Sequence, residues 1–282
     1  VLAWDTAAVL GPAVGGIVLG RLGPAVAFWL DAVSFFAVVA ALLLMRARPP
    51  APVVTEAARA ALLNGLRFVR DRAILWQLML VDFLAVLLVS LNGLLPVFAK
   101  DVLQVGPEGL GLLYAAPSAG AVTGAALFAL LPADGRPGRL VALAIAGYGI
   151  VLALFGLSSS LWPALVFLAL AGGLDAVSMA MRHTVRQLAT PDDYRGRVGA
   201  LASVFAAGGP RLGEFQGGGV ADLIGPRWTM VAGGVASLLM IASSRLWGHA
   251  LWTYEPDTVT AVPAGEDEGI AALPVNEPAA DD

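Results

Sequence analysis

Eight apolar segments, each long enough to cross a lipid bilayer, constrain this chain more than any other feature of its sequence. About 17–25 apolar residues in a helix span the roughly 30 Å hydrocarbon core of a membrane. Short connections rich in Gly, Pro and charged residues separate the segments. They cover residues 2–20, 25–45, 74–99, 110–131, 140–158, 162–181, 198–221 and 226–247. We therefore expect an all-α, polytopic membrane protein with about eight transmembrane helices.

The composition excludes the common classes of soluble protein. Hydrophobic residues make up 58% of the 282 positions and charged residues 13%, whereas soluble domains contain about 25% charged residues. So few charges cannot cover the surface of a soluble globule, which argues against a cytosolic enzyme, a nucleic-acid-binding domain and a disordered protein. The chain has no cysteine and two histidines, so we expect no metal site, no cofactor and no nucleic-acid partner.

The distribution of basic residues predicts how the chain is oriented. When alternate loops are grouped, thirteen arginines fall on one side of the membrane and three basic residues on the other. Cytoplasmic loops carry the excess of Lys and Arg. We therefore expect a cell (inner) membrane protein whose 46–73, 132–139 and 182–197 loops and C-terminal tail are cytoplasmic.

The 46–73 connection is longer than the other loops. It begins with Pro49–Pro50–Ala51–Pro52 and continues with apolar residues at helical spacing between Glu56 and Arg72. This pattern predicts an amphipathic helix at the inner membrane surface. The expected organisation is two helices in 1–45, a cytoplasmic linker in 46–73, six helices in 74–247, and a disordered acidic tail in 248–282.

An internal repeat indicates two related halves. Gly11–Pro12–Ala13–Val14–Gly15 followed by Gly23–Pro24 recurs as Gly209–Pro210–Arg211–Leu212–Gly213 followed by Gly225–Pro226. The offset of about 200 residues has room for six helices. Parallel repeats of six helices are the arrangement of the two halves of major facilitator transporters.

Four longer motifs resemble one branch of that superfamily. They are Leu94–Leu95–Pro96–Val97–Phe98–Ala99–Lys100–Asp101–Val102–Leu103, the segment 109–117, the segment 187–198 and the segment 209–214. Together these resemble the drug and siderophore exporters, a group that includes enterobactin exporters and macrolide efflux proteins. The resemblance implies that 2–45 are helices five and six of a twelve-helix protein, that 74–247 are helices seven to twelve, and that the first four are missing. It also implies secondary active export of a small amphipathic compound, by proton antiport with alternating access.

Acidic residues within the apolar segments are the candidates for proton coupling. An acid at the centre of a membrane helix costs about 2.5–3.5 kcal/mol on insertion scales, so each one indicates a function or a partner. Asp82 and Asp175 have no opposite charge within one turn of their own helices, and for them we weigh a coupling role and a structural role equally. Asp31 is shallower, which favours a structural role.

Arg211 and Glu214 complete the set of transport candidates. They are three residues apart and share a helix face. A self-neutralising ion pair and a role in transport both remain open for them.

The loop that contains Asp134, Arg136 and Arg139 looks like a degenerate form of the superfamily's cytoplasmic Asp-Arg-x-Gly-Arg motif, with an extra glycine after the acid. Charges near helix ends can pair and hold the cytoplasmic face closed. These three residues, with Arg195 and Arg197, are the gating candidates. Arg182 and Arg186 are interpreted as topology charges.

Other classes of protein fit less well. Glu56–Ala57–Ala58 resembles the loop of a permease subunit in an ATP-driven transporter, but Gly65 follows too late. An inactive membrane fragment or scaffold is a further alternative, while an enzyme is not expected because no HExxH, GxSxG or P-loop motif is present. The expected partners are a small-molecule substrate, protons, the lipid bilayer and the missing N-terminal helices.

Overall fold

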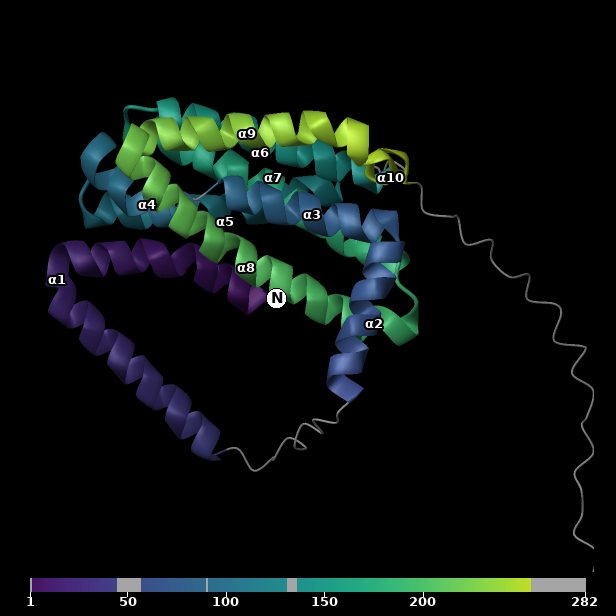
Figure 1. Cartoon of the computed structure of the whole chain (residues 1–282). Coiled ribbons are helices and arrows are strands. Elements are labelled where there is room, and N and C mark those ends of the chain that lie inside the picture. The colour runs from purple at the N-terminus through teal and green to yellow at the C-terminus, as the bar shows by residue number, and fades with distance from the viewer. Residues whose placement is uncertain (1, 45–56, 90, 131–135, 255–282) are drawn as a thin grey trace, which may run out of the picture.

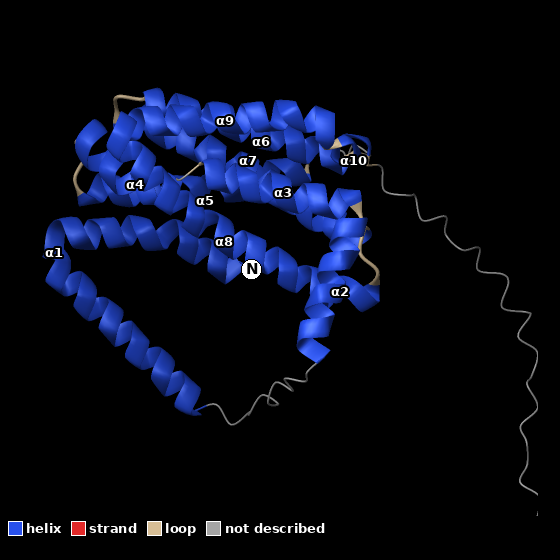
Figure 2. Cartoon of the chain, viewed as in Figure 1, coloured by secondary structure: helices blue, strands red, loops and turns tan. Residues whose placement is uncertain are grey.

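The computed structural model describes residues 2–44, 57–89, 91–130 and 136–254, and these residues form helices joined by short loops, without a strand (Figures 1 and 2). The elements are α1 (Leu2–Leu44), α2 (Ala57–Asp71), α3 (Ala73–Leu88), α4 (Leu91–Val97), the π-helical turn η1 (Phe98–Val102), α5 (Pro107–Ala129), α6 (Pro137–Leu157), α7 (Leu161–Leu188), α8 (Asp192–Ile224), α9 (Pro226–Trp247) and α10 (His249–Thr253). The all-α expectation is confirmed. The first part of the linker, Asp134 and residues 255–282 of the acidic tail lie outside the described residues. The prediction of a disordered tail is wrong for its first residues, because α10 forms there and buries Leu251.

Six of the described helical segments are long and apolar enough to cross a membrane, where the sequence predicted eight. They are Val14–Leu44, Ala73–Val102, Pro107–Ala129, Pro137–Leu157, Leu161–Leu188 and Pro226–Trp247. The predicted 2–20 and 25–45 helices are joined in α1. The predicted 198–221 helix lies within α8, where Arg211, Glu214 and many glycines dilute the apolar residues.

The repeated Gly-Pro dipeptide forms the same backbone turn twice. Gly23 has φ 82° and ψ 169°, and Gly225 has φ 84° and ψ 158°. This region of backbone space is open essentially only to glycine, and the proline that follows each glycine has the φ that a new helix needs at its first position. The turn bends α1 in the first copy and separates α8 from α9 in the second. The internal repeat is therefore visible in the backbone.

The predicted 74–99 helix is interrupted. α3 ends at Leu88, Val89 is extended with φ −119° and ψ 104°, and α4 resumes at Leu91. Within α4, Pro96 has no N–H to donate to the carbonyl of Asn92. The hydroxyl of Tyr114 on α5 donates to that carbonyl instead, at 3.1 Å. The substitute bond fixes α4 against α5 next to the interruption.

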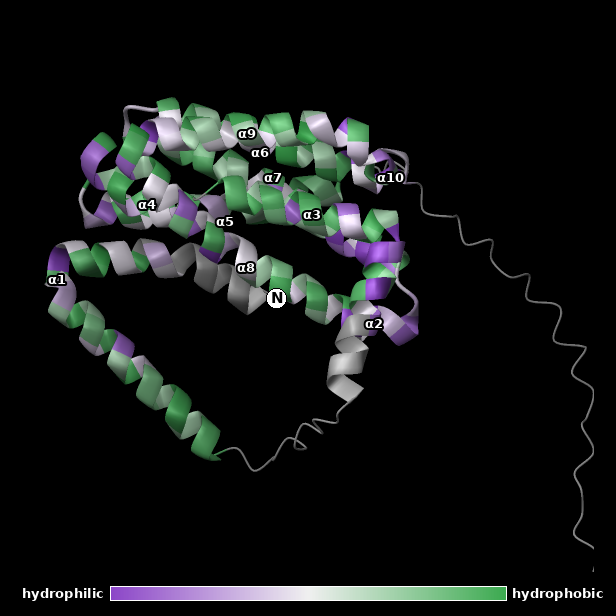
Figure 3. Cartoon of the chain, viewed as in Figure 1, coloured by the Kyte–Doolittle hydropathy of each residue, from purple (hydrophilic) through white to green (hydrophobic). Residues whose placement is uncertain are grey.

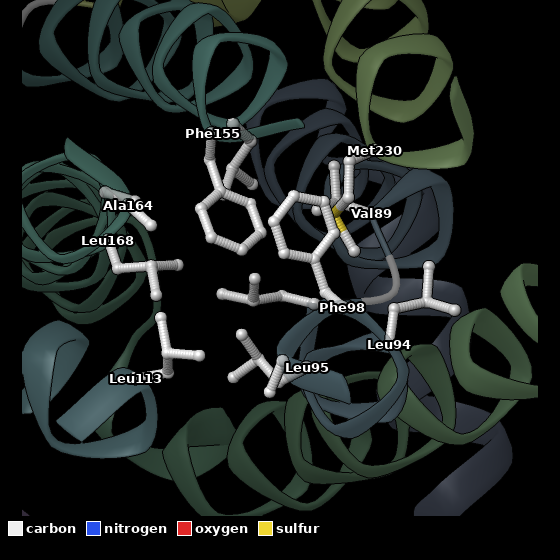
Figure 4. Close-up of a cluster of buried hydrophobic side chains, with 13 residues drawn as sticks. Val89, Leu94, Leu95, Phe98, Leu113, Phe155, Ala164, Leu168 and Met230 are labelled. Carbon is white, nitrogen blue, oxygen red and sulfur yellow. The ribbon is translucent and has the colours of Figure 1, made fainter. Parts of the chain in front are cut away.

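Buried apolar side chains from several helices hold the bundle together. Figure 4 shows one cluster, in which Phe98 and Phe155 lie with ring centroids 4.5 Å apart. α5 and α7 cross so closely that a Cβ on Gly120 would lie 1.7 Å from the carbonyl oxygen of Ala169. Small residues allow such close approach of membrane helices, and this crossing sets the position of α7 in the bundle.

The second arm of α1, after the bend, leaves the bundle (Figure 1). Its side chains are apolar around most of the helix (Figure 3), and Phe28, Trp29 and Phe36 are each more than 70% exposed. Such a surface suits a helix that is covered by lipid or by further helices.

The linker contains the amphipathic helix α2, but its position differs from the expectation. Val69 is fully buried, Phe68 stacks on Tyr194 of α8 with ring centroids 4.3 Å apart, and Gly65 faces Arg197 of α8. α2 therefore packs on α8 at these residues, while Leu66 is 40% exposed, and the position of the helix at the inner membrane surface stays a prediction.

Candidate functional site

Arg182 joins two acids, the partly buried Asp82 and Asp175, whose side chain is 55% exposed. Its Nη1 lies 2.7 Å from Oδ1 of Asp82 on α3, and its Nη2 lies 3.5 Å from Oδ1 of Asp175 on α7. The Arg182 side chain is 13% exposed and that of Asp82 is 25% exposed. A charge-assisted bond at the shorter distance is strong, so Asp82 and Arg182 tie α3 to α7. We call Asp82, Arg182 and Asp175 the charge cluster.

The regular geometry of α7 accounts for part of this arrangement. Asp175, Ser178 and Arg182 are spaced at i, i+3 and i+7, which places them on one face of the helix. α7 also continues to Leu188, so Arg182 and Arg186 belong to a helix and not to the predicted 182–197 loop. Arg182 thus pairs with acids in the bundle instead of lying in a loop, and its role as a topology charge stays a prediction.

Two cavities meet at the charge cluster. The central cavity has a volume of about 310 Å³ and is lined by residues of α3 to α8, among them Asn92, Tyr148, Ser178 and Glu214. The side cavity has a volume of about 280 Å³ and is lined by α3, α7 and α8. Val86, Asp175 and Arg182 line both cavities. The charge cluster therefore stands between two spaces, each of which is large enough for water.

Further charged groups surround Asp82 on the side-cavity face. Besides Arg182 and Asp175, the groups that act on its carboxylate are His183 and Arg186, which also belong to α7 and contact each other. α8 contributes no ionisable residue to the lining of this cavity. The charged groups that act on the Asp82 carboxylate are therefore all carried by α7.

The other transport candidates lie outside the charge cluster. Arg211 and Glu214 are both exposed, and no ion pair joins them in the part of the chain that the structure describes, so the expected self-neutralising pair is not formed. Glu214 instead lines the central cavity and lies beside Gly93 of α4. Asp31 is exposed on the second arm of α1.

Three of the described gating candidates contact their own helix or a neighbouring helix. Arg139 of α6 donates to the carbonyl of Trp252 in α10 at 3.3 Å. Arg195 pairs with Asp192 in the first turn of α8 at 2.9 Å, and the Arg197 guanidinium lies 5.3 Å from the centre of the Tyr194 ring. Arg136 precedes the first residue of α6. That these residues hold the cytoplasmic face closed between two halves of the protein stays a prediction.

One contact that the sequence did not predict joins α1 to α5. Arg21 lies 3.1 Å from Glu108 in the first turn of α5. Beside it, a Cβ on Gly16 would lie 2.7 Å from Cα of Gly111. Glycines at positions 16 and 111 permit a close approach of two helices, but nothing in the sequence shows that these two glycines meet.

Charges buried inside an apolar helical bundle are costly and usually functional, and a turn repeated about 200 residues apart is typical of transporters built from two related halves. The chain therefore falls in the class of polytopic membrane transporters. Its sequence matches the profile of the transmembrane secretion effector family, within the major facilitator superfamily, over residues 2–261, and the chain belongs to this family.

Similar proteins include the enterobactin exporters EntS of Escherichia coli O139:H28 (strain E24377A / ETEC), E. coli O157:H7 (strain EC4115 / EHEC) and Shigella boydii serotype 18 (strain CDC 3083-94 / BS512). Each is 32% identical over 232 residues, which cover 82% of this chain and 56% of the relative. The chain thus spans about half the length of the curated relatives it matches. The resemblance to the exporter branch is confirmed, and the relatives are transporters rather than enzymes.

Proposed function

We propose that the protein is a secondary active transporter that exports a small amphipathic compound of the siderophore or drug class in exchange for protons. The family and the named activity of the relatives support export. The observation that carries the proton-coupled part is the sharing of Arg182 between Asp82 and Asp175. A group that couples protons to transport must be ionisable inside the membrane and must hold helices together in only one of its charge states.

The charge cluster meets both requirements. When Asp82 is ionised, its bond to Arg182 links α3 and α7. Protonation of Asp82 removes the negative charge, and Arg182 is then held by Asp175 on its own helix, which it already approaches to 3.5 Å. The link between α3 and α7 is thereby weakened. A proton taken up outside and released inside would in this way drive alternating access of the central cavity.

The proposal includes the place of this chain in a longer protein. The residues of α1 supply helices five and six, residues 74–247 supply helices seven to twelve, and the substrate path runs between the two halves. The exposed second arm of α1 supports this reading, because its apolar side chains lack cover in the described residues. The 46–73 connection and the tail are proposed to be cytoplasmic, with Asp134, Arg136, Arg139, Arg195 and Arg197 near the cytoplasmic gate.

The test uses the full-length protein, reconstituted in proteoliposomes with an imposed proton gradient and labelled enterobactin as the test compound. Asp82→Asn and Asp175→Asn are each expected to abolish uphill efflux while downhill exchange stays measurable. An amide at position 82 cannot exchange a proton, and an amide at position 175 has no charge to hold Arg182 when Asp82 releases it. Asp31→Asn, which changes an acid outside the charge cluster, is the matched control and should pump as the wild type does. Uphill pumping by both cluster variants would refute the assignment.

The same preparation separates the exporter from the alternative of a permease subunit in an ATP-driven transporter. Collapse of the proton gradient by a protonophore should stop uphill efflux by the wild type. Efflux that requires ATP and survives the protonophore would favour the permease, and absence of any flux would favour an inactive scaffold.

A further inference from the structure

Ser178 of α7 is buried in the wall of the central cavity without a hydrogen-bond partner. The residue is 1% exposed, and its Oγ makes no hydrogen bond to any described residue. A hydroxyl that leaves water without a new partner is unfavourable, so buried hydroxyls are nearly always satisfied by protein or by ordered water. The partner of Ser178 is therefore to be sought in the cavity.

Other hydroxyl side chains on helices in the protein hydrogen-bond to the backbone of their own helix. Thr123, Thr184 and Ser203 each donate to a carbonyl one turn earlier in their own helix, as short hydroxyl side chains commonly do. Ser178 makes no such bond. Its hydroxyl is thus available to a molecule in the cavity.

The neighbours of Ser178 are suited to bind an oxygen atom. Asp175 lies one turn earlier on the same face of α7, where side chains at i and i+3 have Cβ atoms about 5–6 Å apart. One oxygen fits between the two side chains, with a hydrogen bond of ordinary length to each. Arg182 engages Oδ1 of Asp175, which leaves Oδ2 to accept a bond. Tyr148 of α6 lines the same cavity.

We propose that Ser178 and Asp175 together bind a hydroxyl group in the central cavity, either that of a water molecule or that of the transported compound. The bound hydroxyl donates to the carboxylate of Asp175, and the hydroxyl of Ser178 donates to the bound oxygen. The bound group must be a hydrogen-bond donor, because an ionised carboxylate such as that of Asp175 can only accept. The site connects the contents of the cavity directly to the charge cluster. This proposal deepens the transport function and rests on it for its consequence.

The cavity also has the room and the polar groups that such a site needs. A buried water requires about 30 Å³ and two to four polar partners. The cavity offers about 310 Å³, and Ser178, Asp175 and Tyr148 supply the partners.

The variants are Ser178→Ala and the matched control Ser237→Ala, both in the full-length protein. Ser237 on α9 is likewise fully buried with an unpartnered Oγ, but it packs beside Gly149 of α6 and lines neither cavity. Two measurements are made: a structure at a resolution that shows ordered water, without added compound, and the Kd for enterobactin.

An ordered oxygen within hydrogen-bond distance of Ser178 and Asp175, absent in Ser178→Ala and unaffected by Ser237→Ala, identifies the group as water. If the compound-free site is empty and Ser178→Ala raises the Kd for enterobactin about tenfold, the group belongs to the compound.

An empty site together with an unchanged Kd overturns the proposal. In that case both alanine variants should raise the melting temperature alike, because each removes an unsatisfied hydroxyl. The structure of the compound-free protein needs no transport, so failure of the wild type to pump refutes the transport function and leaves the test of this site intact.

Discussion

At the scale of single residues, Arg182 dominates the energetics of the candidate site because it serves two carboxylates on two helices. Taking an ion out of water costs several kcal/mol, and a buried pair recovers this cost only with good geometry. The 2.7 Å contact with Asp82 provides that geometry. Loss of one partner leaves the other charge buried and unpaired, which destabilises the protein more than replacement of both charges by neutral side chains.

The first residue-scale prediction concerns Arg182. Arg182→Ala in the full-length protein should cost about 3–5 kcal/mol of stability, because Asp82 is then buried without its cation. The double variant Arg182→Gln with Asp82→Asn should recover part of this loss. Thermal unfolding monitored by size-exclusion chromatography measures both. Arg211→Ala is the control: it removes an exposed arginine that has no ion pair with Glu214 in the described residues, so unfolding at the wild-type temperature is expected.

The site could be predicted in part from the sequence. The positions of Asp82 and Asp175 inside apolar segments mark them as candidates, because their burial is costly whatever the fold. Their shared partner could not be predicted, because Asp82 and Arg182 lie 100 positions apart and meet only in the folded bundle, where the long Arg182 side chain reaches from α7 to α3. For Arg211 and Glu214 the sequence left an ion pair and a transport role open. Their spacing permits a contact on one helix face, but it does not fix the side-chain conformations, and no ion pair joins them among the described residues.

At the scale of elements, close crossings of helices determine where α7 stands. Gly120 and Gly124 on α5 meet Ala169 and Gly173 on α7 with their backbones nearly in contact. Here the glycines act through their lack of a side chain, since dispersion contacts between backbones replace the hydrophobic effect inside a bilayer.

Gly120→Ala should therefore destabilise the protein strongly. The added methyl group would lie 1.7 Å from the carbonyl oxygen of Ala169, so α5 and α7 must separate and α7 must shift the charge cluster. We expect a lower melting temperature and weaker uphill efflux. Gly196→Ala in the first part of α8 has no atom within 4 Å of the new methyl group, and it should leave stability unchanged or raise it by about 0.4–1 kcal/mol. Equal behaviour of the two variants would contradict the crossing.

At the scale of the whole molecule, the first arm of α1 packs on α5, and the second arm, after the bend, leaves the bundle. Gly16 and Gly111 let the first arm approach, and Arg21 with Glu108 adds an ion pair beside the bend. The ion pair is largely exposed, so its contribution to stability is small, about 0–1 kcal/mol. The close backbone contact is therefore the main link.

The orientation of the molecule in the membrane is tested by cysteine labelling, which is clean because the chain has no cysteine of its own. Single cysteines at Ala51 and Ala264 should be unreachable in intact cells by an impermeant thiol reagent, since the excess of arginine predicts that both segments are cytoplasmic. A cysteine at Gln104, in the loop before α5, should be labelled. Permeabilised cells, in which all three should react, are the control, and the reverse pattern in intact cells would contradict the topology.

The sequence by itself determined the class of fold, the family and the repeated Gly-Pro dipeptide that forms the turn at Gly23 and Gly225. Each of these depends on local chemistry: apolar length matched to a bilayer, and a backbone conformation open only to glycine. Tertiary structure alone decided the interruption after Leu88, the extension of α7 to Leu188 and the meeting of Asp82, Arg182 and Asp175 between two cavities. These features depend on which helices become neighbours, and the energy of a buried charge depends on its neighbours in space rather than on its neighbours along the chain.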